Sequence, residues 1–391
     1  MIESSKRPDS SKVLVIDACD FDGFPVGGQL TTIKQLMAVF GNRLALVGIS
    51  TENGPVGQWT KKHFGGVEYD FFSVGRVDPT IRKPWLPRRF DAYLRLKRYK
   101  KGILSLGLDA AFVIAPEVML AIKGWGIRIA YTFAGVENPL TMPRYAVGKW
   151  LAGPFERGLF SALAKHSEVI MAAADQKAIQ AMKDRSRGVL SDKPVFSSPT
   201  LVDPRIFNLN RTKAPNAGPV LVSCGRLNFV KGWDLVFDAY LKVKNEVPSA
   251  RLYFVGDGED RGKLEARIAE AGADNSVFIT GFLEPRGVAE MLNTAHLFLL
   301  GSYREGWPTA LVEALACGLP AVVTDVSGAS SLIEQGRNGF IAQDRDAEEF
   351  AKKIVAALQL ECPNPTSLKI GGRHSLESWK ATLSELWEPL R

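Results

Sequence analysis

The sequence contains few of the residues that build metal centres or disulfide frameworks. Its 391 residues include only four cysteines and four histidines. These are Cys19, Cys224, Cys317, Cys362, His63, His166, His296 and His374. The cysteines form no C-x-x-C pair and the histidines show no metal-ligand spacing. We therefore expect reduced thiols and no metal site.

Long apolar runs are also missing. No run reaches the roughly 18–20 residues that cross a bilayer, and residues 1–12 lack the apolar core of a secretory signal. Apolar residues nevertheless make up 46% of the chain and charged residues 23%, as in globular proteins. These features predict a cytoplasmic protein, and its length favours two domains.

Positive charge is concentrated in the first half. Residues 1–210 carry 29 Lys/Arg and 19 Asp/Glu, although the whole chain has a net charge of only +7. Within residues 82–101 nine side chains are basic, and aromatic residues lie between them. This combination favours an anionic membrane surface, contacted by Arg88, Arg89, Lys97 and Arg98. A solvated face is the alternative. Because no nucleic-acid-binding motif accompanies the charge, we expect no nucleic-acid partner.

Short apolar runs alternate with helical patterns along both halves. Strands are expected at 12–16, 44–48, 111–114, 128–131 and 169–171, and the strand at 169–171 with the helix after it should close the first domain. The alternation restarts at 220–222 and continues through 251–255, 277–279, 296–300 and 321–324. The pattern predicts an α/β fold of two doubly wound, Rossmann-like domains.

The stretch 301–328 contains the clearest candidates for binding and catalytic residues. Glu305 and Glu313 have seven residues between them and flank a helix start at Pro308 and Thr309. Unpaired N–H groups at a helix start suit a phosphate-bearing ligand, and carboxylates beside it can accept bonds from ribose or sugar hydroxyls. Upstream, Arg226 and Lys231 follow a strand end as G-R-x-x-x-x-K-G, where cations can stabilise the charge of a leaving diphosphate.

The motif E-G-W-P-x-x-L-x-E-A-x-A-x-G-L-P at 305–320 resembles the signature of family 4 retaining glycosyltransferases. The resemblance implies the two-domain GT-B fold, with domains facing across a cleft and a last helix crossing back to the first domain. Residues 1–206 with 375–391 would then form the acceptor-side domain, and 207–374 the nucleotide-sugar donor domain. It also implies retention of configuration and no obligatory metal or other cofactor.

The same resemblance assigns roles to individual residues. Arg226 and Lys231 would contact the donor phosphates, Glu305 the transferred sugar and Glu313 the ribose. The remaining donor-binding candidates are Gly27, Gly28, Thr309, Ala310, Leu311, Gly281 and Phe282. The base contacts would be mainly through the backbone, so UDP and GDP remain alternatives.

One position departs from the family pattern. Many relatives have a histidine in a T-F-H-G turn near the reaction centre, and this chain has Ala134 there. Asp22, Glu117 and Glu137 are alternative polar groups, although ordinary loop polarity explains each of them.

Together these features predict a hexosyltransferase that uses a UDP- or GDP-sugar and a glycan or lipid-linked acceptor in bacterial surface polysaccharide biosynthesis, lipopolysaccharide or exopolysaccharide. It would associate peripherally with the inner face of the cytoplasmic membrane. A nucleotide-sugar epimerase and a non-catalytic GT-B accessory subunit are the alternatives.

Overall fold

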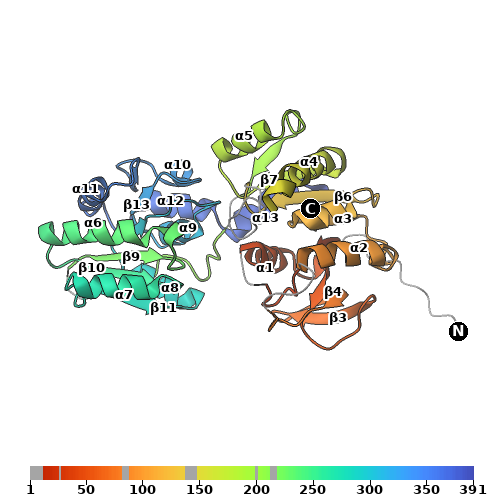
Figure 1. Cartoon of the computed structure of the whole chain (residues 1–391), viewed down its shortest axis with the longest axis horizontal. Helices are drawn as coiled ribbons and strands as arrows, with labels where there is room; N and C mark the ends of the chain where they lie inside the picture. The colour runs from red at the N-terminus through yellow and green to blue at the C-terminus, as the bar shows by residue number, and fades with distance from the viewer. Residues whose placement is uncertain (1–11, 26–27, 82–87, 137–147, 199–200, 212–217) are drawn as a thin grey trace. The chain divides into compact units, whose positions relative to one another are not determined.

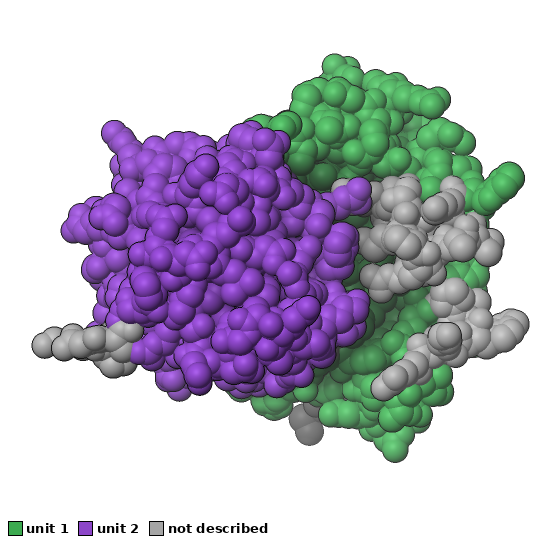
Figure 2. All heavy atoms as spheres, turned by 60° about the vertical axis from the view of Figure 1, so that its left-hand side comes forward, with its two compact units in different colours: residues 1–199, 379–391 green, residues 200–378 purple. Residues whose placement is uncertain are grey.

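A computed structural model describes residues 12–25, 28–81, 88–136, 148–198, 201–211 and 218–391 (Figure 1). The chain divides into two compact units, shown in Figure 2: residues 1–199 with 379–391, and residues 200–378. The boundaries predicted from the sequence lie after residues 206 and 374. Each unit is built around one sheet of mainly parallel strands, which confirms the α/β class with two doubly wound units.

The described part of unit 1 contains an eight-stranded sheet in the order β3-β4-β2-β1-β5-β6-β7-β8. The strands are β1 (Val13–Ile16), β2 (Leu44–Ser50), β3 (Trp59–Phe64), β4 (Val67–Arg76), β5 (Ala110–Val113), β6 (Arg128–Phe133), β7 (Val169–Ala172) and β8 (Val195–Ser197). Only the β3–β4 pair is antiparallel. Strand order reverses between β1 and β5, and such a switch point is where doubly wound sheets bind ligands.

Helices cover both faces of this sheet. They are α1 (Gly28–Phe40), α2 (Arg88–Leu104), α3 (Pro116–Ile122), α4 (Gly148–His166) and α5 (Gln176–Arg185). The side chains of α2, α3, α4 and α5 share one apolar core with the sheet. Helix α3 packs against both α2 and α4 (Figure 1).

The C-terminal segment returns to unit 1, as predicted. Helix α13 (Leu376–Leu386) begins in unit 2, and the chain from Trp379 onward belongs to unit 1. The indole N–H of Trp387 donates to Glu168 at 2.9 Å, and Arg43 donates to the Arg391 carbonyl at 2.6 Å. These bonds fix residues 387–391 to two separate segments of unit 1.

Two expectations for unit 1 need correction. The strand at 169–171 is not the last one, because the three-residue β8 follows α5 and pairs with β7. The β3–β4 hairpin was not predicted either, since β3 has two adjacent lysines and β4 begins with alternating charged residues. β8 is only three residues long, and the buried run of β4 follows a charged first half.

The described part of unit 2 contains a parallel sheet in the order β11-β10-β9-β12-β13-β14. The strands are β9 (Val220–Cys224), β10 (Arg251–Val255), β11 (Val277–Gly281), β12 (Leu297–Leu300), β13 (Ala321–Thr324) and β14 (Gly339–Ala342). Successive side chains point to opposite faces, so Leu299 joins one apolar core and Leu300 the other. Strand order reverses between β9 and β12, which gives this unit its own switch point.

Helices again occupy both faces. The helices are α6 (Trp233–Glu246), α7 (Arg261–Glu270), α8 (Pro285–Thr294), α9 (Thr309–Ala316), α10 (Ala329–Leu332), α11 (Ala347–Ala357) and α12 (Pro365–Arg373). Helices α6, α7 and α11 share one core, and α8, α9 and α12 the other. Helix α9 therefore starts at the carboxyl end of β12, beside the switch point.

Candidate functional site

Two loops meet at the switch point of unit 2. One follows β9 and covers residues 225–232, and the other follows β12 and covers residues 301–308. Because β9 and β12 are neighbouring parallel strands, both loops leave the same edge of the sheet. The sequence-predicted groups Arg226, Lys231 and Glu305 all lie in these loops.

The two loops are tied together by backbone contacts. The Tyr303 amide donates to the Val230 carbonyl at 2.8 Å. Gly232 has a φ of +60°, and a Cβ there would lie 1.8 Å from the Gly301 carbonyl oxygen. Arg345 donates to the carbonyls of Ser302 at 3.0 Å and Gly301 at 2.8 Å. This packing holds residues 231 and 305 in register with each other.

Lys231 and Glu305 form a close ion pair. The Lys231 Nζ lies 2.7 Å from Oε1 and 3.0 Å from Oε2 of Glu305. The Ser302 hydroxyl donates to the same Oε1 at 2.6 Å. The Glu305 side chain is only 9% exposed, whereas that of Lys231 is 36% exposed. The carboxylate is thus held from two sides while the ammonium group reaches solvent.

Glu313 lies on the first turns of α9 in different surroundings. Burial raises its pKa to about 8, and the groups that interact with it include the buried thiols of Cys224 and Cys317. Among the described residues its carboxylate has no hydrogen-bond or ion-pair partner. The Glu313 side chain is half-buried, and a desolvated carboxyl group without a protein partner is characteristic of functional positions.

Arg226 is exposed at the start of the loop after β9. Its guanidinium has no hydrogen-bond or ion-pair partner within the part of the chain that the structure describes. Farther along the loop, Phe229 stacks on Tyr303 with ring centroids 4.4 Å apart, and Arg345 lies over the Tyr303 ring. The loop is therefore ordered by aromatic contacts while Arg226 keeps its full capacity for an external anion.

The other predicted donor contacts of unit 2 also follow strand ends. Thr309 begins α9, Ala310 is partly exposed, and Leu311 is fully buried, so that only its backbone can serve a ligand. Gly281 ends β11 with a φ of +74°, and the following Phe282 is 74% exposed. Their donor-binding roles stay predictions.

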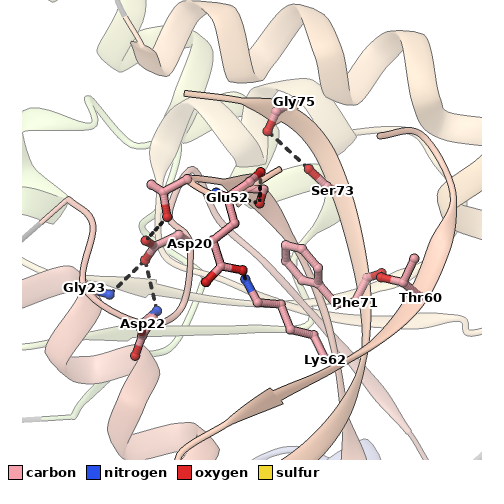
Figure 3. Close-up of polar contacts among 11 residues, drawn as sticks. Asp20, Asp22, Gly23, Glu52, Thr60, Lys62, Phe71, Ser73 and Gly75 are labelled. Atoms are coloured by element: carbon pink, nitrogen blue, oxygen red, sulfur yellow. Dashed lines mark hydrogen bonds and ion pairs between the residues drawn. The ribbon is translucent and has the colours of Figure 1, made fainter. Parts of the chain in front are cut away.

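The predicted residues of unit 1 do not meet at one place as those of unit 2 do. Gly27 and Glu137 lie outside the described residues, and Gly28 is the first residue of α1. Ala134 is exposed just after β6. Asp22 lies in a turn organised by its neighbour Asp20. Figure 3 shows the Asp20 carboxylate accepting from the amides of Asp22 and Gly23, each at 2.9 Å.

The four basic residues assigned to a membrane surface fall into two groups. The Arg88 guanidinium lies over the Phe24 ring, and Arg89 reaches Glu117 at 3.4 Å. Both are thus engaged within unit 1. Lys97 and Arg98 are exposed on the outer side of α2.

Sequence reasoning missed Ser302 and Arg345. Ser302 lies within the motif stretch, and its position three residues before Glu305 is a usable local signal. Arg345 lies after β14, and no spacing links it to the loop after β12.

Among the described residues no group of three or more His, Cys, Asp or Glu side chains is placed to hold a metal ion. None of the described helices is long and apolar enough to span a membrane.

Comparison with known proteins finds similarity over the part of the chain that contains this site. Residues 205–374 match the family model "Glycosyl transferases group 1". The amylovoran biosynthesis glycosyltransferase AmsK of Erwinia amylovora is 30% identical over 166 residues, which cover 41% of each chain. The chain spans about two fifths of the length of the curated relatives that it matches at 30% identity or more.

Solved structures resemble the chain over nearly its whole length. Sucrose-phosphate synthase from Thermosynechococcus elongatus aligns with a TM-score of 0.72 and 16% identity, covering 97% of this chain and 99% of that one. Alr3699/HepE from Anabaena, in complex with UDP, aligns with a TM-score of 0.69 and 16% identity, covering 96% and 98%. At this identity the likeness establishes the fold, which is that of GT-B glycosyltransferases.

Proposed function

Because residues 205–374 match the family model "Glycosyl transferases group 1", we propose that the chain is a glycosyltransferase of this family. It transfers a hexose from a UDP- or GDP-sugar to a glycan or lipid-linked saccharide and retains the anomeric configuration, as in family 4. The observation that carries this proposal is the Lys231–Glu305 ion pair at the switch point of unit 2.

The proposed roles follow from charge and position. Arg226 and Lys231 bind the diphosphate and stabilise its charge as the glycosidic bond breaks. Glu305 binds the transferred sugar, and Glu313 accepts hydrogen bonds from the ribose. The departing phosphate takes the acceptor's proton, since Ala134 provides no base. These steps use no metal ion.

The comparisons support a role in surface polysaccharide assembly. AmsK is named for amylovoran biosynthesis, and HepE binds UDP in its solved structure. A non-catalytic subunit would not need the Lys231–Glu305 pair together with an unpaired Arg226. An epimerase would need a pair of acid and base groups around the sugar, and the described residues of unit 2 offer Glu305 already paired with Lys231.

The donor site can be tested by thermal unfolding with UDP, GDP and their sugars. One nucleotide series should raise the midpoint temperature. At a ligand concentration of 100 times Kd, binding adds about 2.7 kcal/mol to the free energy of unfolding. Arg226→Ala should abolish the shift without lowering the midpoint of the free protein, because Arg226 has no described partner to lose. Arg337→Ala, at the exposed turn before β14, should keep the shift. A folded wild-type protein that responds to neither nucleotide would contradict the donor site and favour the accessory subunit.

We further propose that the outer side of α2 contacts an anionic membrane from the cytoplasmic side. Phe90 and Leu94 are 49% and 45% exposed, and Lys97, Arg98 and Lys101 project from the same side at helical spacing. The buried residues of α2 are Ala92, Leu96 and Ile103, on the opposite side. Exposed apolar side chains bordered by cations match the interface of an acidic bilayer.

Reversal of three charges tests this surface. The triple variant Lys97→Glu, Arg98→Glu and Lys101→Glu should bind vesicles of phosphatidylglycerol and phosphatidylcholine more than tenfold more weakly, because each cation near such a surface contributes about 1 kcal/mol. The matched triple variant Lys123→Glu, Lys165→Glu and Lys177→Glu has the same net charge and should bind like wild type. Equal losses in both variants would indicate nonspecific attraction, and unchanged binding in the first would contradict the proposal.

A further inference from the structure

A second polar cluster lies at the carboxyl edge of the unit 1 sheet, at the point where strand order reverses. Asp17 follows β1, and Tyr131 is near the end of β6. Gln29, Arg89 and Glu117 come from the first turns of α1, α2 and α3. Five separate segments therefore bring polar side chains to the switch point of a sheet whose other positions are apolar.

Hydrogen bonds link four of these residues into a chain. The Gln29 amide donates to Asp17 Oδ2 at 2.6 Å, and Arg89 Nη2 donates to the Gln29 carbonyl oxygen at 3.4 Å. Arg89 Nη1 lies 3.4 Å from Glu117 Oε1. Both contacts of Arg89 are long for hydrogen bonds, so its guanidinium can still donate a shorter bond to an additional partner.

Two polar groups of the cluster, one of them buried, have no partner among the described residues. Glu117 Oε2 is buried and has no hydrogen-bond partner. Tyr131 is only 1% exposed, and its hydroxyl has no partner among the described residues. Burial, with Glu117 and Asp17 nearby, raises the pKa of Tyr131 well above its usual value, so the phenol stays protonated as a donor. A buried acceptor such as Glu117 Oε2 normally finds a partner, which indicates that a ligand supplies it, and the free Tyr131 hydroxyl offers that ligand a donor.

We propose that this cluster binds the hydroxyl groups of an uncharged sugar, and that this sugar is the acceptor end of the transfer reaction. Tyr131 donates to one sugar oxygen, and Glu117 Oε2 accepts from a hydroxyl. This assignment rests on the proposed glycosyltransferase function. It also gives Arg89 and Glu117 a role in recognition instead of membrane contact or general base catalysis.

The charges of the cluster select a neutral ligand. Asp17 and Glu117 together oppose the single positive charge of Arg89. Burial raises the pKa of Asp17 to about 6, so this carboxylate is mostly ionised at neutral pH. A phosphate or uronate group would therefore meet net repulsion, whereas adjacent donors and acceptors match the hydroxyls of a neutral hexose.

Saturation-transfer NMR on the full chain tests the proposal. The probes are the methyl glycosides of glucose, galactose and mannose, compared with the corresponding hexose 6-phosphates. At least one neutral glycoside should bind, and the phosphates should bind more weakly. Tyr131→Phe and Glu117→Gln should each weaken binding about tenfold, because each removes one hydrogen bond in a buried site. Tyr69→Phe is the matched control, since its hydroxyl bonds the Met37 carbonyl elsewhere in unit 1.

The outcomes separate this site from the donor site. The midpoint shift with UDP or GDP should be the same in wild type, Tyr131→Phe and Glu117→Gln. Absence of glycoside binding in a protein that responds to nucleotide would overturn the acceptor site alone. Preferential binding of the phosphates, or wild-type binding in both cluster variants, would also overturn it. Glycoside binding without any nucleotide response would support the sugar site and contradict the proposed transferase.

Discussion

Replacement of Lys231 by methionine is expected to lower kcat by about 10²–10³, the usual loss when a fixed group that stabilises transition-state charge is removed. Methionine keeps much of the side-chain length but removes the cation that lies 2.7 Å from Glu305. The charge of the diphosphate grows as it leaves, so the loss should fall on kcat and kcat/KM about equally, with little change in donor KM. Steady-state kinetics with the UDP- or GDP-sugar selected by thermal shift measures both.

The same variant should also be less stable, which provides an independent readout. Without Lys231 the Glu305 carboxylate, only 9% exposed, keeps Ser302 as a donor but loses its counter-charge. The double variant Lys231→Met with Glu305→Gln should regain stability without regaining turnover. Lys263→Met, which removes an exposed lysine paired with Asp260 at 2.6 Å, is the control and should keep wild-type kcat. Wild-type turnover by Lys231→Met would remove this lysine from the mechanism.

The unit 2 site was largely predictable because its signals are local. Arg226 and Lys231 directly follow one buried strand, and Glu305 directly follows another. The resemblance to family 4 glycosyltransferases linked the two loop motifs, and the structure brings both to one edge of the sheet because β9 and β12 are parallel neighbours. The pairing of Lys231 with Glu305 was not predictable. It depends on the close approach of Gly232 to Gly301, which no spacing in the sequence encodes.

The unit 1 cluster shows the opposite case. Asp17, Gln29, Arg89, Glu117 and Tyr131 span more than a hundred residues, and each is unremarkable in its own segment. Arg89 was interpreted as part of the basic run at 82–101, because charge along one segment carries no information on which helix turn faces the sheet edge. The structure places Arg89 on the first turn of α2, where it reaches Glu117 of the neighbouring helix.

A second large effect is expected at Glu313, in the pH dependence of stability. Burial raises its pKa from 4.5 to about 8, so the folded state holds this proton more tightly than the unfolded state. Its contribution to stability is therefore fully present below pH 4.5 and is lost as the pH rises to 8. A shift of this size corresponds to on the order of 3–5 kcal/mol.

Glu313→Gln should consequently raise the unfolding midpoint of the free protein above pH 8 and have little effect below pH 4.5. Glu290→Gln, an exposed change on α8, should leave the pH profile as it is in wild type. An unchanged profile for Glu313→Gln would show that the carboxylate is not desolvated. Above pH 8 the variant should also lose most of the midpoint shift with UDP or GDP, because a neutral amide replaces the ionised carboxylate that accepts the ribose hydroxyls. A protein that is more stable without this group but binds its donor poorly would show that the cost of burying Glu313 is maintained for function.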